Sequence, residues 1–336
     1  MVNVDKLRRL FEAYRDFDDV LFQKTAQSII EESVATNRMV EARDLKKALG
    51  DGTLTSLKHS KQATLVPLSS RNDSSLLKLE ESTIHRGQLV LTEGAQKKID
   101  RILQEHRSKT ALHGSGLKAK SRILFWGPPG CGKTLTSKYL AYELGLPIAV
   151  VQLSSLISSY LGDTSTHLRK IFEFINNKPV VLLLDEFDAV GKSRSDKQDV
   201  GEVKRVVNSL LQLFDAYASD KSIIIAASNY QDILDEALWR RFDDIVSFEK
   251  PNKIERTRFL EMLLRDIKVE GSLSKISMAM NNLSFAEIEK VVQEAMKTVV
   301  IRGEKKLTDK ELASHLAQYK NDILRARGAP SSSKKK

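Results

Sequence analysis

One short segment, RILFWGPPGCGKT (122–134), constrains the fold of this chain more than any other. An apolar run, RILFW, is followed by a glycine-rich turn and then by the helix-like segment KTLTSKYLAYELG (133–145). The turn fits the pattern G-x-x-x-x-G-K-[ST], in which glycines let backbone N–H groups surround phosphates at the N-terminus of a helix. A match in this strand–turn–helix context predicts a P-loop nucleotide-binding domain.

The residue types of the turn predict separate contacts with a nucleotide. Lys133 is expected to reach the β- and γ-phosphates, and Thr134 is expected to hold Mg²⁺. Cys131 is interpreted as a small side chain that the turn tolerates, in preference to a redox switch. The candidate nucleotide-binding residues here are Gly127, Pro128, Pro129, Gly130, Cys131, Gly132, Lys133, Thr134 and Leu135.

The segments after the turn repeat the order strand, loop, helix. The runs PIAVVQL (147–153), PVVLLLDE (179–186) and SIIIAASN (222–229) are continuously apolar, and helical patterns separate them. Continuous apolar strands indicate burial on both faces, as in a mostly parallel sheet. The predicted fold class is therefore α/β: a P-loop NTPase parallel sheet sandwiched by helices, with a C-terminal α-helical lid and a small helical N-terminal region.

The same patterns predict the domain limits. Apolar residues recur at helical spacing near the start, and Gly50 is a plausible C-cap. Polar, turn-rich stretches follow, with room for short strands, and only helical patterns appear after Pro251. The expected order is a helical region (1–50), a linker (51–87), a large α/β domain (88–250), a helical lid (251–324) and a basic disordered tail (325–336).

Composition sets the class of protein and its expected compartment. Hydrophobic residues make up 41% and charged residues 29% of the 336 residues, as in a soluble globular protein. The sequence has no apolar run near the ~20 residues of a membrane-spanning helix, and its start lacks a signal peptide. With a single cysteine, no intrachain disulfide forms. We therefore expect a cytoplasmic location.

The net charge of +10 raises the question of nucleic-acid binding. Much of the basic excess lies in residues 96–122 and in the tail from Arg325 onward. A basic run at a chain end is usually solvated, and these runs lack interleaved aromatic residues on which bases stack. Nucleic acid stays an open but disfavoured partner.

A second motif, VVLLLDEFD (180–188), ends an apolar strand in two acidic residues. Asp185 is placed to bind Mg²⁺, directly or through water, and Glu186 to polarise the water that attacks the γ-phosphate. An acidic strand end is common by itself, but it follows the phosphate loop by about 50 residues. The pair favours hydrolysis over simple nucleotide binding, and predicts ATP and Mg²⁺ as cofactors.

Two later features of the sequence narrow the class of nucleotide-hydrolysing protein. Asn229 ends the strand SIIIAASN and is expected beside the γ-phosphate, although asparagine at a strand end is ordinarily a turn former. Arg240 and Arg241 are adjacent in ALWRRFDD. An arginine from a neighbouring subunit can stabilise the charge of a transferring phosphoryl group.

Together these motifs resemble the AAA+ ATPase family over roughly residues 88–300. The resemblance implies a ring, usually hexameric, with ATP at the subunit interfaces. On that pattern Gly127–Thr134 is the Walker A segment and Asp185–Glu186 the Walker B pair. Asn229 looks like the sensor-1 residue, and Arg240 and Arg241 look like arginine fingers. Their adjacency resembles the microtubule-severing and membrane-remodelling branch, and leaves open which arginine contributes more.

The lid segment beginning at Ser284 resembles a family stretch, Ser-Gly-Ala-Asp, that packs near the adenine. Ala286 is the matching candidate binding residue. Here Phe285 replaces the family's glycine and Glu287 its aspartate. The phenylalanine puts the local backbone contact in question, and no sensor-2 arginine stands at this point.

A polar loop contains the aromatic Tyr160, followed by Leu161 and Gly162. In polypeptide-threading members of the family, this position carries a pore loop that grips substrate. An aromatic ring offers sequence-tolerant apolar contact, and glycine allows the loop to bend. The alternative is a tyrosine packed on its own domain. A second loop, GKSRSDKQDVGE (191–202), would face the same pore, with Lys192, Arg194 and Lys197 solvated or touching acidic groups.

The leading hypothesis is an ATP-driven motor that unfolds, disassembles or remodels a protein substrate, as a chaperone does. The resemblance implies a homo-oligomeric ring, recruitment through the N-terminal region, and a partner effector such as a protease. The competing hypothesis is a nucleic-acid-dependent AAA+ ATPase, such as a loader or transposition regulator. A small-molecule kinase fits less well, because the Walker B glutamate and paired arginines suit hydrolysis in an oligomer.

Overall fold

The computed structural model describes residues 6, 8, 19–35, 67–68, 75–159, 163–192, 200–217, 221–230, 236–304 and 306–328. The chain divides into two compact units, Met1–Leu65 and Val66–Lys336. In the first unit, helix α2 (Asp19–Ala35) buries Thr25, Ala26, Ile29 and Ser33. These positions recur every three or four residues, so they share one face of the helix.

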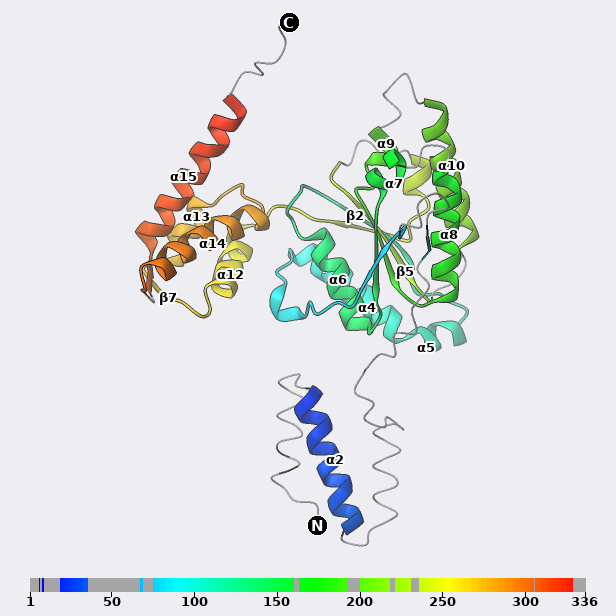
Figure 1. Cartoon of the computed structure of the whole chain (residues 1–336), viewed down its shortest axis with the longest axis horizontal. Coiled ribbons are helices and arrows are strands. Elements are labelled where there is room, and N and C mark those ends of the chain that lie inside the picture. The colour runs from blue at the N-terminus through cyan, green and yellow to red at the C-terminus, as the bar shows by residue number, and fades with distance from the viewer. Residues whose placement is uncertain are drawn as a thin grey trace, which may run out of the picture. The chain divides into compact units, whose positions relative to one another are not determined.

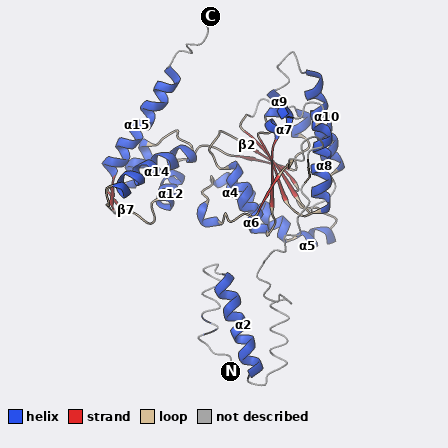
Figure 2. Ribbon diagram, in the orientation of Figure 1, coloured by secondary structure: helices blue, strands red, loops and turns tan. Residues whose placement is uncertain are grey.

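The second unit is built on a six-stranded sheet with the order β1-β3-β4-β5-β2-β6. Figure 2 shows its strands between helices. The strands after β1 pair in parallel, as predicted, and β1 pairs antiparallel to β3. Strand β1 falls within residues 51–87, where we expect a linker with short strands. The strands are β1 (Lys78–Glu80), β2 (Arg122–Trp126), β3 (Ile148–Gln152), β4 (Val181–Asp185), β5 (Ile223–Ser228) and β6 (Asp244–Ser247).

Helices cover both faces of this sheet (Figure 1). Alternate residues of each strand point to opposite faces. Leu124 and Leu182 join one buried cluster with α8 and α10, and Ile123 and Leu183 join the other with α4 and α6. The helices of this part, with the 3-10 helix η1, are η1 (Arg86–Gln88), α4 (Glu93–Arg107), α5 (Lys109–Gly114), α6 (Lys133–Leu144), α7 (Leu153–Ser159), α8 (Thr164–Asn177), α9 (Ala189–Lys192), α10 (Val200–Ala216) and α11 (Glu236–Trp239). The predicted helix–sheet–helix sandwich is confirmed.

The lid follows Pro251 and has a hydrophobic core of its own, which includes Leu260, Ile288 and Leu312. Its elements are α12 (Lys253–Leu263), β7 (Lys268–Glu270), α13 (Leu273–Ala279), α14 (Phe285–Ile301), β8 (Lys306–Thr308) and α15 (Asp309–Gly328). Strands β7 and β8 pair in parallel, so the prediction of helices alone was incomplete. Helix α15 includes residues 325–328, and the rest of the predicted tail lies outside the described residues.

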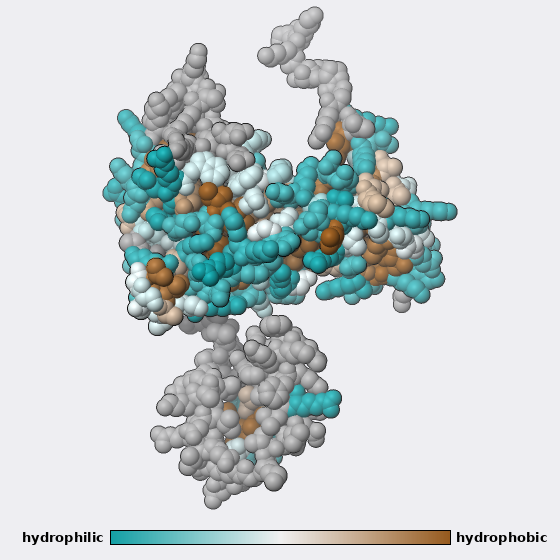
Figure 3. Space-filling model, turned by 180° about the vertical axis from the view of Figure 1, so that it is seen from behind, coloured by the Kyte–Doolittle hydropathy of each residue, from teal (hydrophilic) through white to brown (hydrophobic). Residues whose placement is uncertain are grey.

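Hydrophobic surface is scattered over the face of the second unit drawn in Figure 3, which is otherwise largely hydrophilic. Among the described residues, no helix combines the length and the apolar character needed to cross a membrane.

Asp243 joins the starts of two neighbouring strands, β2 and β6. Its Oδ2 accepts hydrogen bonds from the backbone N–H groups of Ser121 and Arg122, both at 2.9 Å. Its Oδ1 accepts from Arg122 Nη2 at 2.7 Å. Burial raises the pKa of Asp243, but these hydrogen bonds outweigh burial and hold the pKa below its ordinary value.

We expect Asp243→Ala to destabilise the fold by about 2 kcal/mol, because charge-assisted hydrogen bonds are lost and two N–H groups lose their acceptor. The free energy of unfolding is measured by urea titration. Because the folded pKa is lowered, the contribution of Asp243 is complete above the unfolded pKa of about 3.9 and is lost as the pH falls through the folded pKa. A cost that is equal at pH 7 and pH 2.5 would contradict this account.

Candidate functional site

The phosphate loop connects β2 to α6 and depends on its glycines. Gly127, Gly130 and Gly132 have φ values of 143°, 74° and 96°, which L side chains rarely adopt. A Cβ atom on Gly127 would lie 1.9 Å from the carbonyl oxygen of Phe248, which follows β6. Helix α6 begins directly after Gly132, so its first N–H groups face the loop.

Lys133 is the first residue of α6, and its side chain is buried. Its Nζ donates to the carbonyl oxygens of Gly127 at 2.6 Å and Pro128 at 3.0 Å. Burial lowers the pKa of Lys133, while Asp185 and Asp188 act in the opposite direction. The loop therefore holds an ammonium group next to N–H groups, an arrangement that fits an anionic phosphate.

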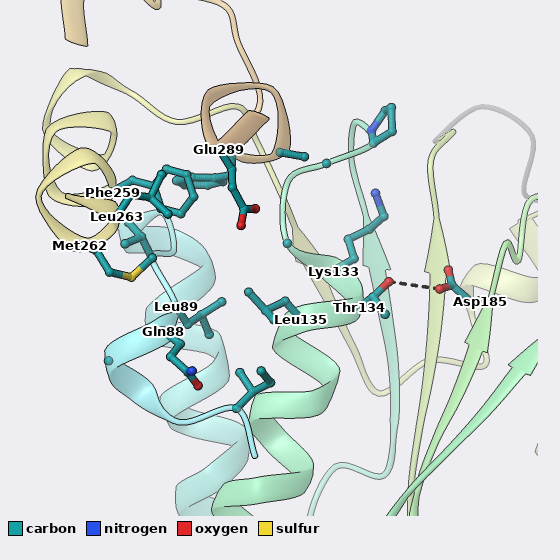
Figure 4. A pocket seen from close by; sticks show the side chains of 18 of the residues that line it. Gln88, Leu89, Lys133, Thr134, Leu135, Asp185, Phe259, Met262, Leu263 and Glu289 are labelled. Atoms are coloured by element: carbon teal, nitrogen blue, oxygen red, sulfur yellow. Dashed lines mark hydrogen bonds between the residues drawn. The ribbon is translucent and has the colours of Figure 1, made fainter. Parts of the chain in front are cut away.

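Thr134 and Asp185 meet across the gap between α6 and the end of β4. Thr134 Oγ1 donates to Asp185 Oδ2 at 3.1 Å (Figure 4). Hydroxyl and carboxylate oxygens are the ligands that Mg²⁺ prefers, and Mg²⁺ is usually held by one or two such groups together with phosphates. The two side chains therefore fit the predicted metal role.

Glu186 follows Asp185 in a backbone conformation with φ of 54°, unusual for a residue other than glycine. Its backbone N–H donates to Asp185 Oδ1 at 2.9 Å, and its carboxylate accepts a hydrogen bond from Ser154 Oγ. Ser154 lies in the first turn of α7, which directly follows β3, and no sequence pattern singled it out. Non-glycine residues in this conformation cost of order 1–3 kcal/mol and cluster at functional sites.

Asn229 directly follows β5, the strand next to β4 in the sheet. Its backbone N–H donates to Asp188 Oδ1 at 3.3 Å, and Asp188 is buried. Lys133 follows β2 after the phosphate loop, Asp185 is the last residue of β4, and Asn229 follows β5; these strands are neighbours in the sheet. Parallel strands bring their carboxyl ends to one edge, so the structure assembles the predicted groups there.

A cavity of about 740 Å³ adjoins these residues. This volume is in the range of small-molecule sites. One wall is polar and includes Gly130, Lys133, Asp185, Glu186 and Asn229. The other lining residues are mainly apolar and were not predicted, apart from Leu135 and Ala286; they include Ile84, Leu89, Val90, Leu135, Phe259, Met262, Leu263, Phe285 and Ala286, together with the polar or charged Gln88, Arg265, Asp266 and Glu289.

The lid contacts the phosphate loop at the start of α14. The N–H of Ala286 donates to the carbonyl oxygen of Gly130 at 3.1 Å. A Cβ atom on Gly130 would lie 2.8 Å from Ser284 Oγ, so glycine permits this approach. Phe285 packs in the lid core and also borders the cavity, and its ring centroid lies 4.9 Å from that of Phe259. The start of α14 therefore contacts the phosphate loop through Ala286 although Phe285 replaces the family's glycine.

Several predicted residues lie away from the cavity. Gly127, Pro128 and Cys131 do not line it, and Cys131 is buried in the core cluster beside α4 and α6. Burial raises the pKa of the Cys131 thiol, which disfavours the reactive thiolate.

The predicted arginine fingers are not among the residues that line this cavity, and the predicted pore loop lies outside the described residues. Arg240 and Arg241 follow α11 and do not line it, and Arg241 Nε lies 2.7 Å from Asp215 Oδ1. Tyr160, Leu161 and Gly162 fall outside the described residues, as do Arg194, Lys197 and the side chain of Lys192.

Comparison with known proteins shows the family to which this chain belongs. The family model "ATPase family associated with various cellular activities (AAA)" matches residues 123–250, which contain the phosphate loop and strands β2 to β6. The "Uncharacterized AAA family ATPase y4kL" of Sinorhizobium fredii is 37% identical over 312 residues, which are 93% of each chain.

Other relatives match over part of their length. The "Proteasome-activating nucleotidase" of Pyrococcus horikoshii is 31% identical over 74% of this chain and 65% of its own. The "ATP-dependent zinc metalloprotease FtsH 1" of Salinibacter ruber is 34% identical over 54% of this chain and 28% of its own. The chain thus spans less than two thirds of these two proteins. From the near full-length similarity to y4kL and the matching family model, this chain belongs to the AAA family of ATPases and hydrolyses ATP.

Proposed function

We propose that the protein is a ring-forming ATPase motor that remodels a protein substrate, by threading it through a central pore. The observation that carries this proposal is the course of α7. This helix starts beside Glu186, through the hydrogen bond from Ser154, and ends at Ser159, directly before Tyr160. One short rigid element therefore links the candidate hydrolytic group to the candidate substrate loop.

In this proposal the cavity holds ATP, with its phosphates on the polar wall. The N–H groups of the loop and Lys133 bind and orient the phosphates, and Glu186 accepts the proton of the attacking water. Asn229 orients groups near the γ-phosphate. Thr134 and Asp185 would hold Mg²⁺, which neutralises phosphate charge when bound.

In this proposal the arginine pair acts between neighbouring subunits of the ring. Since Arg240 and Arg241 do not line the cavity of their own chain, they suit a site on a neighbouring subunit. Both arginines of the pair are candidates for the contact with phosphate across the subunit interface. A hexamer is the ring that the family resemblance favours.

The names of several relatives support the proposal of a protein substrate. They include a "Proteasome-activating nucleotidase" and a "Putative 26S proteasome regulatory subunit homolog", and also ATP-dependent proteases. We propose by analogy a chaperone-like role in the cytoplasm, with recruitment through the N-terminal region and an effector such as a protease as partner.

The pairing of basic residues argues against nucleic acid as the main partner. In the basic stretch 96–122, several cations are paired with carboxylates on the same or neighbouring elements. These pairs are Lys97–Glu93, Lys98–Asp244, Arg101–Glu105, Arg107–Glu143, Lys120–Asp244 and Arg122–Asp243. Cations held in this way contribute less to a phosphate-binding surface than the sequence charge suggests.

We expect Tyr160→Ala to leave the basal ATPase rate within about twofold of the parent, and to abolish its stimulation by an unfolded protein. The variant loses the apolar ring that grips the chain. The measurement is phosphate release with and without casein as the unfolded probe. Tyr160→Phe, which keeps the ring, is the matched control and should retain stimulation.

Full stimulation of the Tyr160→Ala protein would contradict threading through this loop. The same assay with DNA and RNA across a salt series tests the competing hypothesis. Stimulation by nucleic acid that falls steeply with salt, with none by casein, would favour the nucleic-acid-dependent ATPase.

A further inference from the structure

The cavity is divided into regions of different chemistry. Gly130, Lys133 and Thr134 form an end that suits phosphates, and Phe259, Met262 and Leu263 of α12 contribute to an apolar wall that suits a flat base. A nucleoside triphosphate would therefore lie with its ribose between these two regions. This inference rests on the proposed nucleotide site.

Glu289 provides a carboxylate in that middle region. It lies on the second turn of α14, and its side chain points into the cavity between the apolar wall and the phosphate loop (Figure 4). The start of α14 is fixed against the loop by the hydrogen bond from Ala286 N–H to Gly130 O. The position of the Glu289 backbone is thus tied to the position of the phosphates.

The hydrogen bonding of Glu289 leaves capacity for a ligand. Gln293 Nε2, one turn along the exposed side of the same helix, donates to Glu289 Oε1 at 3.2 Å. An ionised carboxylate offers about four acceptor positions on its two oxygens. Among the described residues Glu289 forms no ion pair, and of the cations that line the same cavity Lys133 lies at the phosphate loop and Arg265 Nε lies 3.2 Å from Asp266 Oδ2.

We propose that Glu289 is a specificity-determining residue that accepts hydrogen bonds from the ribose hydroxyl groups of ATP. A carboxylate repels phosphates, and it gains nothing from the apolar face of a base. The ribose is the part of the nucleotide that brings O–H donors between these regions. Hydrogen bonds from a hydroxyl to a charged acceptor are stronger than neutral ones, so loss of the donor should lower the affinity for the nucleotide.

The test compares ATP with 2′-deoxy-ATP, 3′-deoxy-ATP and inosine triphosphate, which lacks the 6-amino group of adenine. Dissociation constants are measured by calorimetry in the Glu186→Gln background, where the nucleotide stays intact, and kcat/KM is measured without that change. We expect the parent to prefer ATP over at least one deoxy analogue by about tenfold. In Glu289→Ala this ratio should fall to near one, while the ratio of ATP to inosine triphosphate stays unchanged.

Two variants serve as comparisons. Glu289→Gln keeps an acceptor oxygen and should retain part of the discrimination. Glu294→Ala changes a carboxylate on the same helix that pairs with Lys297 and does not line the cavity, and it should behave as the parent. Thermal unfolding of each variant shows that the fold is retained.

Three results would overturn the assignment. The first is a parent protein that does not distinguish ATP from the deoxy analogues. The second is a Glu289→Ala protein in which the ratios of ATP to the deoxy analogues are unchanged. The third is a loss of discrimination confined to inosine triphosphate, which would place Glu289 at the adenine amino group. If ATP still binds tightly, these results contradict only the role of Glu289, and the proposed nucleotide site stands. Failure of the parent to bind ATP would overturn the site and the assignment together.

Discussion

Lys133→Ala should lower ATP affinity by about 100-fold or more and abolish measurable hydrolysis, because removing one partner of a buried charge pair costs about 2–5 kcal/mol. The side chain of Lys133 is buried against the phosphate loop, and its Nζ lies within 3.0 Å of two carbonyl oxygens of that loop. Bound phosphates would present a full negative charge at that position. Calorimetry gives the affinity, and phosphate release gives the rate.

The matched control for this change is Lys138→Ala. Lys138 lies on the same helix, but its Nζ pairs with Glu80 at 3.1 Å and it does not line the cavity. Partly exposed ion pairs contribute about 0–1 kcal/mol, so this variant should bind and hydrolyse ATP almost as the parent does. Parent-like ATP binding by Lys133→Ala would refute the assignment of the phosphate site.

The polar half of the site could be predicted because its signals are local. Lys133, Asp185 and Asn229 each lie at or after the end of a strand whose apolar sequence predicts a parallel sheet, and parallel strands place their ends at one edge. Once the sheet is predicted, the proximity of these residues follows without knowledge of the lid. The hydrogen bond between Thr134 and Asp185 is the direct outcome of this arrangement.

The apolar half of the site depends on how the lid docks, and sequence patterns do not report that. Leu89, Met262 and Leu263 look like ordinary core residues, yet they line the cavity. Ser154 is one serine among several, and its partner Glu186 lies 32 residues away. Strands β7 and β8 have three residues each, too few for a recognisable alternation.

Glu186→Gln should reduce ATP hydrolysis by about 100-fold or more while ATP affinity stays near that of the parent, because general-base catalysis contributes about 10²–10⁴-fold. The amide keeps the size of the side chain and its hydrogen bonding with Ser154, but it does not accept a proton from water. Thr134, Asp185 and Lys133, which are assigned to binding, are unchanged. Calorimetry and single-turnover phosphate release separate the two effects.

Ser154→Ala is the control that separates proton transfer from placement of the side chain. It removes the hydroxyl that donates to Glu186 and leaves the carboxylate, so we expect hydrolysis to change far less than in Glu186→Gln. If both variants lost hydrolysis equally, the position of Glu186 rather than its basicity would limit the reaction. If Glu186→Gln hydrolysed ATP at the parent rate, another group would have to activate the water. Asp185 would then be the nearest carboxylate to examine, because its Oδ1 accepts the backbone N–H of Glu186.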